Sequence, residues 1–257
     1  FVFSDGWVVR GVGVLSQKAV YSFGTELGNT LYGCEGVDVQ YGAAGSDRLY
    51  GYAGNDELYG EAGTDTLQGG DGDDELHGGA DSDTLYGGSG NDRFIFNLGD
   101  GQDVIIADDA AGIDSLVFGA GITYDDVTLE KVNYDLVVKV GQSGDQVTLV
   151  NWFYAAYVDK RMDQFIFSDG TIISGAELLV QKAVYSFGTE SNETLVGHEG
   201  VDIQYGGVGS DYLYGYAGND VLYGDAGADT LQGGDGDDEL HGGADNDKVE
   251  GGSGDGV

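Results

Sequence analysis

The chain has 257 residues, and its 46 acidic against 10 basic residues give a formal net charge of −36. A surface this negative repels phosphate backbones and anionic lipids, so the composition excludes nucleic acids and such membranes as partners. Glycine accounts for 49 residues, proline is absent, and the single cysteine excludes a disulfide framework within the chain. No run of eighteen apolar residues occurs, so we expect no membrane insertion.

The chain divides into four parts in order along its length. We expect the tail of a preceding connector module at 1–23, a first repeat block at 24–96, a β-rich connector module at 97–187, and a truncated second block at 188–257. Residues 1–93 align without a gap with residues 165–257, at an offset of 164, and 65 of the 93 aligned pairs are identical. This near-identity predicts a fragment of a longer tandem array.

A nine-residue motif close to G-G-x-G-x-D-x-L-x recurs through both blocks, most clearly at Gly69–His77. A period of nine fits no helix, and it is typical of a stack of short strands joined by glycine turns. Two nonapeptides then make one 18-residue coil with a strand on each side. The apolar residue at position eight points inward, because successive side chains on a strand alternate between its faces.

The turn residues of this motif provide the oxygen ligands that a calcium site needs. Glycine at positions one, two and four lets the backbone adopt turn conformations and direct its carbonyl oxygens toward a common point. The position-six aspartate adds a carboxylate, and calcium prefers six to eight such oxygens. Aspartates eighteen residues apart stack along one edge, which predicts about nine interior sites, five in the first block and four in the second. The predicted metal ligands are Asp38, Asp47, Asp56, Asp65, Asp74, Asp83, Asp92, Asp202, Asp211, Asp220, Asp229, Asp238 and Asp247, together with backbone carbonyls of the glycine turns.

Departures from the motif locate weaker coils at the start of each block. Gln40 and Gln204 stand where leucine is expected, so we expect a poorer core there. Asn29 and Glu193 replace the aspartate of the preceding degenerate repeat.

The connector has a different sequence pattern, because its apolar residues occur in alternating runs that predict strands of a small β domain. Asp169-Gly170 within Phe165–Ile173 indicates a tight hairpin, and Ser174–Ala183 is the one stretch that favours a helix. Asp100 and Asp103 follow the first block closely, and they are candidates for capping it as additional calcium ligands. The predicted strands are Val104–Ile106, Ser115–Phe118, Leu136–Val140 and Val147–Trp152.

These repeats, over residues 33–95 and 197–256, resemble the repeats-in-toxin (RTX) family of haemolysin-type calcium-binding repeats. The resemblance implies an all-β fold, a right-handed parallel β-roll with calcium in its glycine turns, in two blocks joined by the connector. It also implies export by bacterial type I secretion. The connector, with Asn151-Trp152-Phe153 and the hairpin segment, resembles the related region that separates such blocks.

Three classes of function follow. The preferred one is a calcium-dependent structural module of a large secreted or cell-surface bacterial protein, largely disordered without calcium because its stacked carboxylates repel one another. The second is the accessory region of a secreted enzyme; no His-Glu-x-x-His or Gly-x-Ser-x-Gly motif occurs, so we expect no catalysis in this chain. The third is a module for glycan binding or self-association, as in an adhesin or surface layer. Its candidate surface is the outward tyrosines at position nine, including Tyr41, Tyr50 and Tyr59, for which cross-strand packing that stiffens the sheet is the alternative interpretation.

Overall fold

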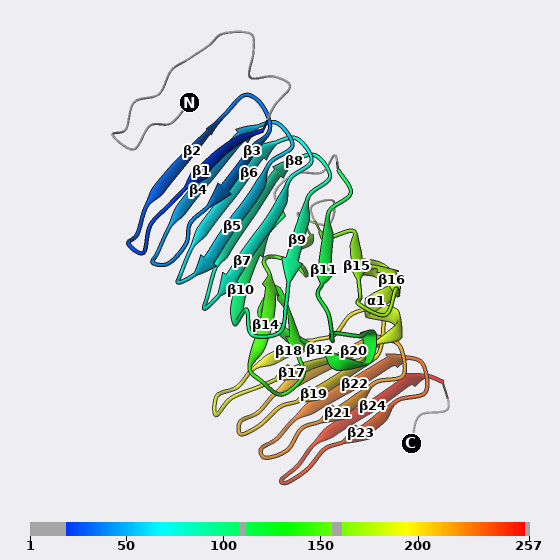
Figure 1. The fold of residues 1–257 in the computed structure, drawn as a ribbon. Helices are drawn as coiled ribbons and strands as arrows, with labels where there is room; N and C mark the ends of the chain where they lie inside the picture. The colour runs from blue at the N-terminus through cyan, green and yellow to red at the C-terminus, as the bar shows by residue number, and fades with distance from the viewer. Residues whose placement is uncertain (1–18, 108–111, 156–160, 255–257) are drawn as a thin grey trace. The chain divides into compact units, whose positions relative to one another are not determined.

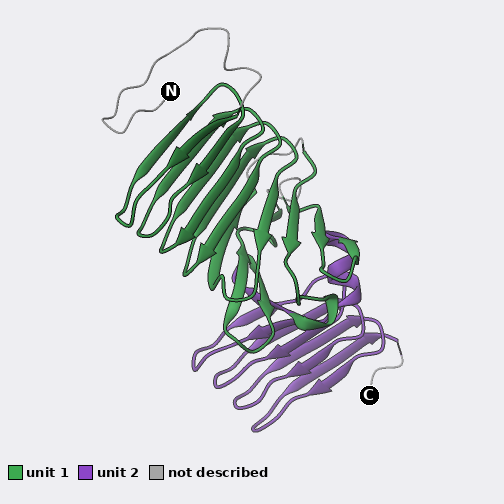
Figure 2. Cartoon of the chain, in the orientation of Figure 1, with its two compact units in different colours: residues 1–127, 134–173 green, residues 128–133, 174–257 purple. Residues whose placement is uncertain are grey.

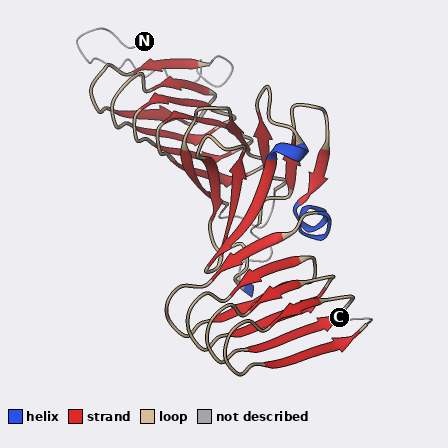
Figure 3. Cartoon of the chain, turned by 90° about the horizontal axis from the view of Figure 1, so that it is seen from below, coloured by secondary structure: helices blue, strands red, loops and turns tan. Residues whose placement is uncertain are grey.

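The computed structural model of the chain is almost entirely β, and it describes residues 19–107, 112–155 and 161–254 (Figure 1). Most of the predicted connector tail, residues 1–23, therefore lies outside the described residues. The chain divides into two compact units, one comprising 1–127 and 134–173, the other 128–133 and 174–257 (Figure 2). In each unit the strands lie side by side and the loops lie at their ends (Figure 3).

In the first unit successive nonapeptides alternate between two parallel sheets. Partner residues are eighteen apart, as in the pair Leu49 and Leu67, so one coil takes two nonapeptides as predicted. One sheet contains β1 (Val20–Phe23), β3 (Asp38–Tyr41), β5 (Glu57–Ala62), β7 (Glu75–Ala80) and β9 (Arg93–Phe96). The other contains β2 (Thr30–Cys34), β4 (Arg48–Ala53), β6 (Thr66–Asp71) and β8 (Thr84–Ser89).

The leucines at position eight form the core of this roll, which confirms the predicted inward face. They are at most 1% exposed and stack in register along the coils. The strands are longer than predicted, since β6 continues from positions seven to nine through the next three residues. The glycine-rich segment pairs as well, with Tyr52 opposite Gly70. The stacked leucines are Leu49, Leu58, Leu67, Leu76 and Leu85.

The glutamines that replace leucine are fully buried and bind the backbone. Nε2 of Gln40 donates to the Tyr50 carbonyl oxygen at 2.9 Å, and Nε2 of Gln204 donates to the Tyr214 carbonyl oxygen at 3.0 Å. Oε1 of each side chain is buried without a hydrogen-bond partner. A buried unsatisfied acceptor is destabilising, so the predicted weaker core is found in the first coil of both blocks.

The connector strands of the first unit continue the two sheets of the roll. β10 (Gln102–Ile106) pairs in parallel with β8, and β11 (Ser115–Phe118) pairs in parallel with β9, so no break in pairing marks residue 96. The boundary between block and connector stays a prediction. Beyond them β14 (Asp145–Leu149) pairs with β10, β13 (Asp135–Val140) pairs antiparallel with β14, and a 3₁₀ turn covers Tyr124–Asp126.

The predicted hairpin and helix are both present. β15 (Gln164–Ile166) neighbours β16 (Ile172–Ser174), and Gly170 between them has the positive φ, +88°, that the turn requires. α1 (Gly175–Gln181) begins after Ser174, whose hydroxyl accepts the Glu177 N–H while the Glu177 carboxylate accepts the Ser174 N–H. This reciprocal capping explains why so short a segment forms a helix.

The second unit repeats the roll. Leu213, Leu222 and Leu231 are fully buried in its core. One sheet contains β12 (Val127–Val132, of which 128–132 belong to this unit), β17 (Val184–Phe187), β19 (Asp202–Tyr205), β21 (Val221–Tyr223) and β23 (Glu239–His241). The other contains β18 (Thr194–Val196), β20 (Tyr212–Ala217), β22 (Thr230–Asp235) and β24 (Lys248–Ser253). Within the described ranges no helix is long and apolar enough to cross a membrane.

Candidate metal centres

In the glycine-rich turns that precede Asp47 to Asp92 and Asp211 to Asp247, which begin in the last residues of a strand or directly after it, two residues have a positive φ, at positions two and four of the nonapeptide. In the turn before Asp74 these are Gly70 and Gly72, with φ of +123° and +130°. Position two does not always carry glycine, since Tyr52 and Glu61 adopt φ of +78° and +75° there. The fold thus imposes this turn geometry even on residues that disfavour it.

The position-six aspartates form hydrogen-bonded ladders along the turns. The Asp56 N–H donates to Oδ1 of Asp74 at 2.8 Å, and the Asp47 N–H donates to Oδ1 of Asp65 at 2.7 Å. In the second unit the Asp229 N–H donates to Oδ1 of Asp247 at 3.1 Å. The structure places every predicted aspartate ligand in such a ladder: Asp38, Asp56, Asp74 and Asp92; Asp47, Asp65 and Asp83; Asp202, Asp220 and Asp238; Asp211, Asp229 and Asp247.

The second carboxylate oxygen of most of these aspartates is buried with no hydrogen-bond partner. Asp56 is 1% exposed, and its Oδ2 accepts nothing. A Cβ added at Gly51 would lie 2.3 Å from that oxygen, so the carboxylate fills the space that glycine at position one leaves. The same unsatisfied Oδ2 occurs at Asp47, Asp56, Asp65, Asp74, Asp83, Asp211, Asp220, Asp229 and Asp238.

Burial makes these carboxylates hard to ionise in the absence of a cation. It raises the pKa of Asp74 to about 8 and that of Asp83 to about 7, and neighbouring aspartate charges add to the shift. The same cause raises the pKa of Asp56, Asp65 and Asp220 to about 6. Buried carboxylates without a counter-charge are costly, and a divalent cation removes that cost.

The arrangement fits calcium through carboxylates and backbone together. Over residues 19–107, 112–155 and 161–254, no three His, Cys, Asp or Glu side chains converge in a way that could hold a metal ion. The ligands of any ion in these turns would therefore include main-chain carbonyls, as the glycine pattern predicts. Hard oxygens in variable number suit calcium better than metals that need nitrogen or sulfur.

The ladders extend into the connector beyond the nonapeptides. The Asp83 N–H donates to Oδ1 of Asp103 at 3.0 Å, and the Asp92 N–H donates to Oδ1 of Asp114 at 2.9 Å. The Asp114 N–H in turn donates to Oδ2 of Asp163 at 2.9 Å. Asp100 lies outside the ladder: its Oδ2 accepts the Asn97 N–H at 2.7 Å and closes a local turn.

Asp114 and Asp163 were not predicted, because insertions in the connector break the spacing of eighteen. A local signal was present nevertheless. Asp103, Asp114 and Asp163 each stand two residues before a buried apolar side chain of a strand, as a position-six aspartate stands before its leucine. The pattern Asp-x-apolar is not specific to ladder positions, since Asp135 and Asp145 also precede a buried valine by two residues but accept the N–H of Asn151 and Gly99.

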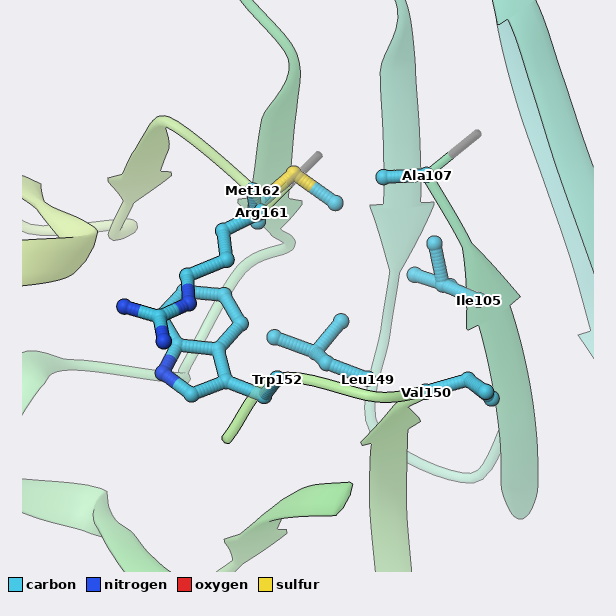
Figure 4. Close-up of a pocket in the computed structure, with 7 residues that line it drawn as sticks. All are labelled: Ile105, Ala107, Leu149, Val150, Trp152, Arg161 and Met162. Carbon is cyan, nitrogen blue, oxygen red and sulfur yellow. The ribbon is translucent and has the colours of Figure 1, made fainter. Parts of the chain in front are cut away.

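A pocket in the first unit offers no comparable chemistry. It is lined mostly by apolar side chains, among them Ile105, Leu149 and Met162, and Arg161 lies against the ring of Trp152 (Figure 4). The guanidinium carbon is 5.8 Å from the ring centroid. This pocket contains no acid–base pair and no nucleophile.

The family of the chain follows from its repeats. The model of the RTX calcium-binding nonapeptide repeat family matches seven overlapping stretches that together cover residues 23–105 and 187–257. The chain belongs to this RTX repeat family. Residues 135–177 match the haemolysin-type calcium binding protein related domain, within the predicted connector.

No curated protein sequence matches the chain. Among solved structures, the chain is similar to the solution structure of the AlgE6R3 subunit from the Azotobacter vinelandii mannuronan C5-epimerase, with 26% identity and a TM-score of 0.33. That match covers 63% of this chain and 87% of the other.

Proposed function

We propose that this chain is a calcium-binding structural module of a large secreted or cell-surface bacterial RTX protein, which folds on calcium binding after type I secretion. The observation that carries this proposal is the set of buried carboxylate oxygens with no partner in the glycine turns. Sites of the extracellular class bind calcium at about 10⁻⁴ to 10⁻³ M, so the turns would be empty in the cytosol and filled outside the cell.

The ions would sit between stacked aspartates along each ladder. Nine pairs of predicted ligands lie within the two blocks, five in the first and four in the second. Calcium there would neutralise the stacked charges, and main-chain carbonyls of the turns would complete its coordination. Folding and metal binding would then be coupled, since the unfolded chain presents no assembled site.

A test compares two aspartates of one turn in calcium binding by equilibrium dialysis. Asp74 is buried with an unsatisfied oxygen, whereas Asp71 is exposed and its Oδ1 accepts the Ser89 hydroxyl at 2.8 Å. D74N should lower the number of bound calcium ions by one or two, because Asp74 belongs to two pairs. D71N removes the same charge and should leave the number unchanged. Equal numbers for the two variants would contradict the proposal.

Contact with glycan or with a second copy is another candidate function, and the stacked aromatic side chains are the surface that would make it. Tyr41 and Tyr59 stack with ring centroids 4.8 Å apart, and Tyr59 stacks on His77 at 4.4 Å. The second unit repeats this stack, with Tyr205 and Tyr223 4.9 Å apart. Because the rings cover each other's faces, they favour stiffening of the sheet over stacking on sugars.

A further inference from the structure

The turns that open each nonapeptide block differ in backbone from the rest. Cys34 and His198 occupy position two of the turns 33–38 and 197–202, and neither has a left-handed φ. In the later turns the equivalent residues, such as Tyr52 and Gly70, are left-handed.

In these first turns the N–H of position two binds the position-six carboxylate. The Cys34 N–H donates to Oδ2 of Asp38 at 2.7 Å, and the His198 N–H donates to Oδ2 of Asp202 at 2.7 Å. We call a turn closed when the N–H of position two donates to the side chain of position six. We call a turn open when Oδ2 of its position-six aspartate has no hydrogen-bond partner. The preceding degenerate turns are closed by Asn29 and Glu193, which accept the N–H of Thr25 and Thr189.

Oδ2 of the position-six aspartate therefore accepts a backbone N–H in the closed turns at Asp38 and Asp202, whereas it has no hydrogen-bond partner in the open turns. Oδ2 lies over the glycine of position one in both: a Cβ added at Gly33 would meet Oδ2 of Asp38 at 2.7 Å, and one at Gly51 would meet Oδ2 of Asp56 at 2.3 Å. Only the Asp56 oxygen lacks a donor. An open turn therefore has a vacant acceptor for a cation, and a closed turn has satisfied it internally.

At Asp202 the protein also supplies basic side chains. Nδ1 of His198 lies 2.9 Å from Oδ2 of Asp202, and its Nε2 lies 3.1 Å from the Leu179 carbonyl oxygen. Lys131 on β12 donates through Nζ to the Val196 carbonyl oxygen. Burial lowers the pKa of Lys131, and the nearby Asp202 carboxylate partly offsets this. A buried carboxylate with such neighbours needs no metal ion to balance it.

Oδ1, the other carboxylate oxygen of Asp202, does not offer a calcium ligand toward Asp220. Oδ1 of Asp202 is buried without a hydrogen-bond partner. In the ladder this atom faces the preceding coil, since Oδ1 of Asp220 accepts the Asp202 N–H at 2.8 Å. The vacant oxygen of Asp202 thus lies on the side away from Asp220.

We propose that the closed turns bind no calcium, so that the first coil of each block is a metal-free template for the calcium-bound coils that follow. This inference rests on the proposed calcium function of the open turns. In the second unit His198 and Lys131 balance the negative charge of the Asp202 carboxylate, as calcium does in the open turns. Of the nine aspartate pairs, Asp38/Asp56 and Asp202/Asp220 each contain a closed turn, which leaves 9 − 2 = 7 interior ions.

The decisive experiment measures bound calcium by equilibrium dialysis for the full chain and for D202N and D220N. Asn29 shows that an amide oxygen can close such a turn, because it accepts the Thr25 N–H, so D202N should still fold. We expect D202N to bind as many ions as the unaltered chain and D220N to bind at least one fewer. A loss of one ion or more in D202N, with the far-ultraviolet circular dichroism spectrum unchanged, would overturn the proposal.

D38N and D56N repeat the test in the first unit, and they decide the question if D202N fails to fold. We expect D38N to keep the ion number and D56N to lower it. If the unaltered chain binds no calcium, the proposed function itself fails. If it binds calcium and D202N and D38N lose ions as D220N and D56N do, only the metal-free template is wrong.

Discussion

Acidification from pH 8 to pH 5 in the presence of chelator should increase the β-sheet signal of the calcium-free chain. Burial raises the folded-state pKa of Asp74 to about 8, of Asp83 to about 7 and of Asp56 to about 6, against about 3.9 for an unfolded aspartate. The metal-free fold then binds more protons than the unfolded chain. These carboxylates contribute stability that is fully present below about pH 4 and is lost as the pH rises through 6 to 8. Far-ultraviolet circular dichroism at fixed chelator concentration measures the change.

The calcium-loaded chain should respond in the opposite sense. Calcium binds ionised carboxylates, so lowering the pH releases the metal. Sedimentation at each pH serves as a control, because the β signal must rise in the monomer and not in aggregates. A chelated chain whose β signal falls between pH 8 and pH 5 would show that ionised aspartates stabilise the fold, and the burial argument would be wrong.

Gly72→Ala should destabilise the calcium-loaded first roll by roughly 2 to 5 kcal/mol. Gly72 has a φ of +130°, which side-chain-bearing residues rarely adopt, and a Cβ there would lie 1.9 Å from the Gly54 carbonyl oxygen. The backbone penalty is about 1 to 2 kcal/mol and the overpacking about 1 to 3 kcal/mol. Urea denaturation in excess calcium measures the difference.

Gly144→Ala is the matched control in the same unit. Gly144 also has a positive φ, +94°, but nothing lies within 4 Å of an added Cβ, so only the backbone penalty of about 1 to 2 kcal/mol applies. Equal destabilisation by the two substitutions would mean that the coils are not packed as closely as the distances at Gly72 require.

Much of the fold could be predicted because it depends on local, periodic features. The leucines at position eight are buried in register, and Ser174 with Glu177 marks the start of α1. Each of these signals lies within a few residues in the sequence. The periodic aspartates likewise predict their own ladders, since a spacing of eighteen equals one coil.

What the sequence did not predict depends on contacts between distant segments. Asp163 joins the ladder of Asp114 across 49 residues, and no periodicity relates them. Lys131 and His198 are 67 positions apart, yet both lie near Asp202. Closed turns lack the positive φ that open turns have at position two, and residue type alone does not determine this φ, since tyrosine and glutamate adopt it there.

The most direct test of calcium-driven folding is a calcium titration of the chelated chain at neutral pH, followed by far-ultraviolet circular dichroism and hydrodynamic radius together. We expect a cooperative gain of β signal with a decrease in radius, at free calcium of about 10⁻⁴ to 10⁻³ M. A chain that is already compact and rich in β structure in chelator, and that changes neither signal as calcium is added, would contradict the account.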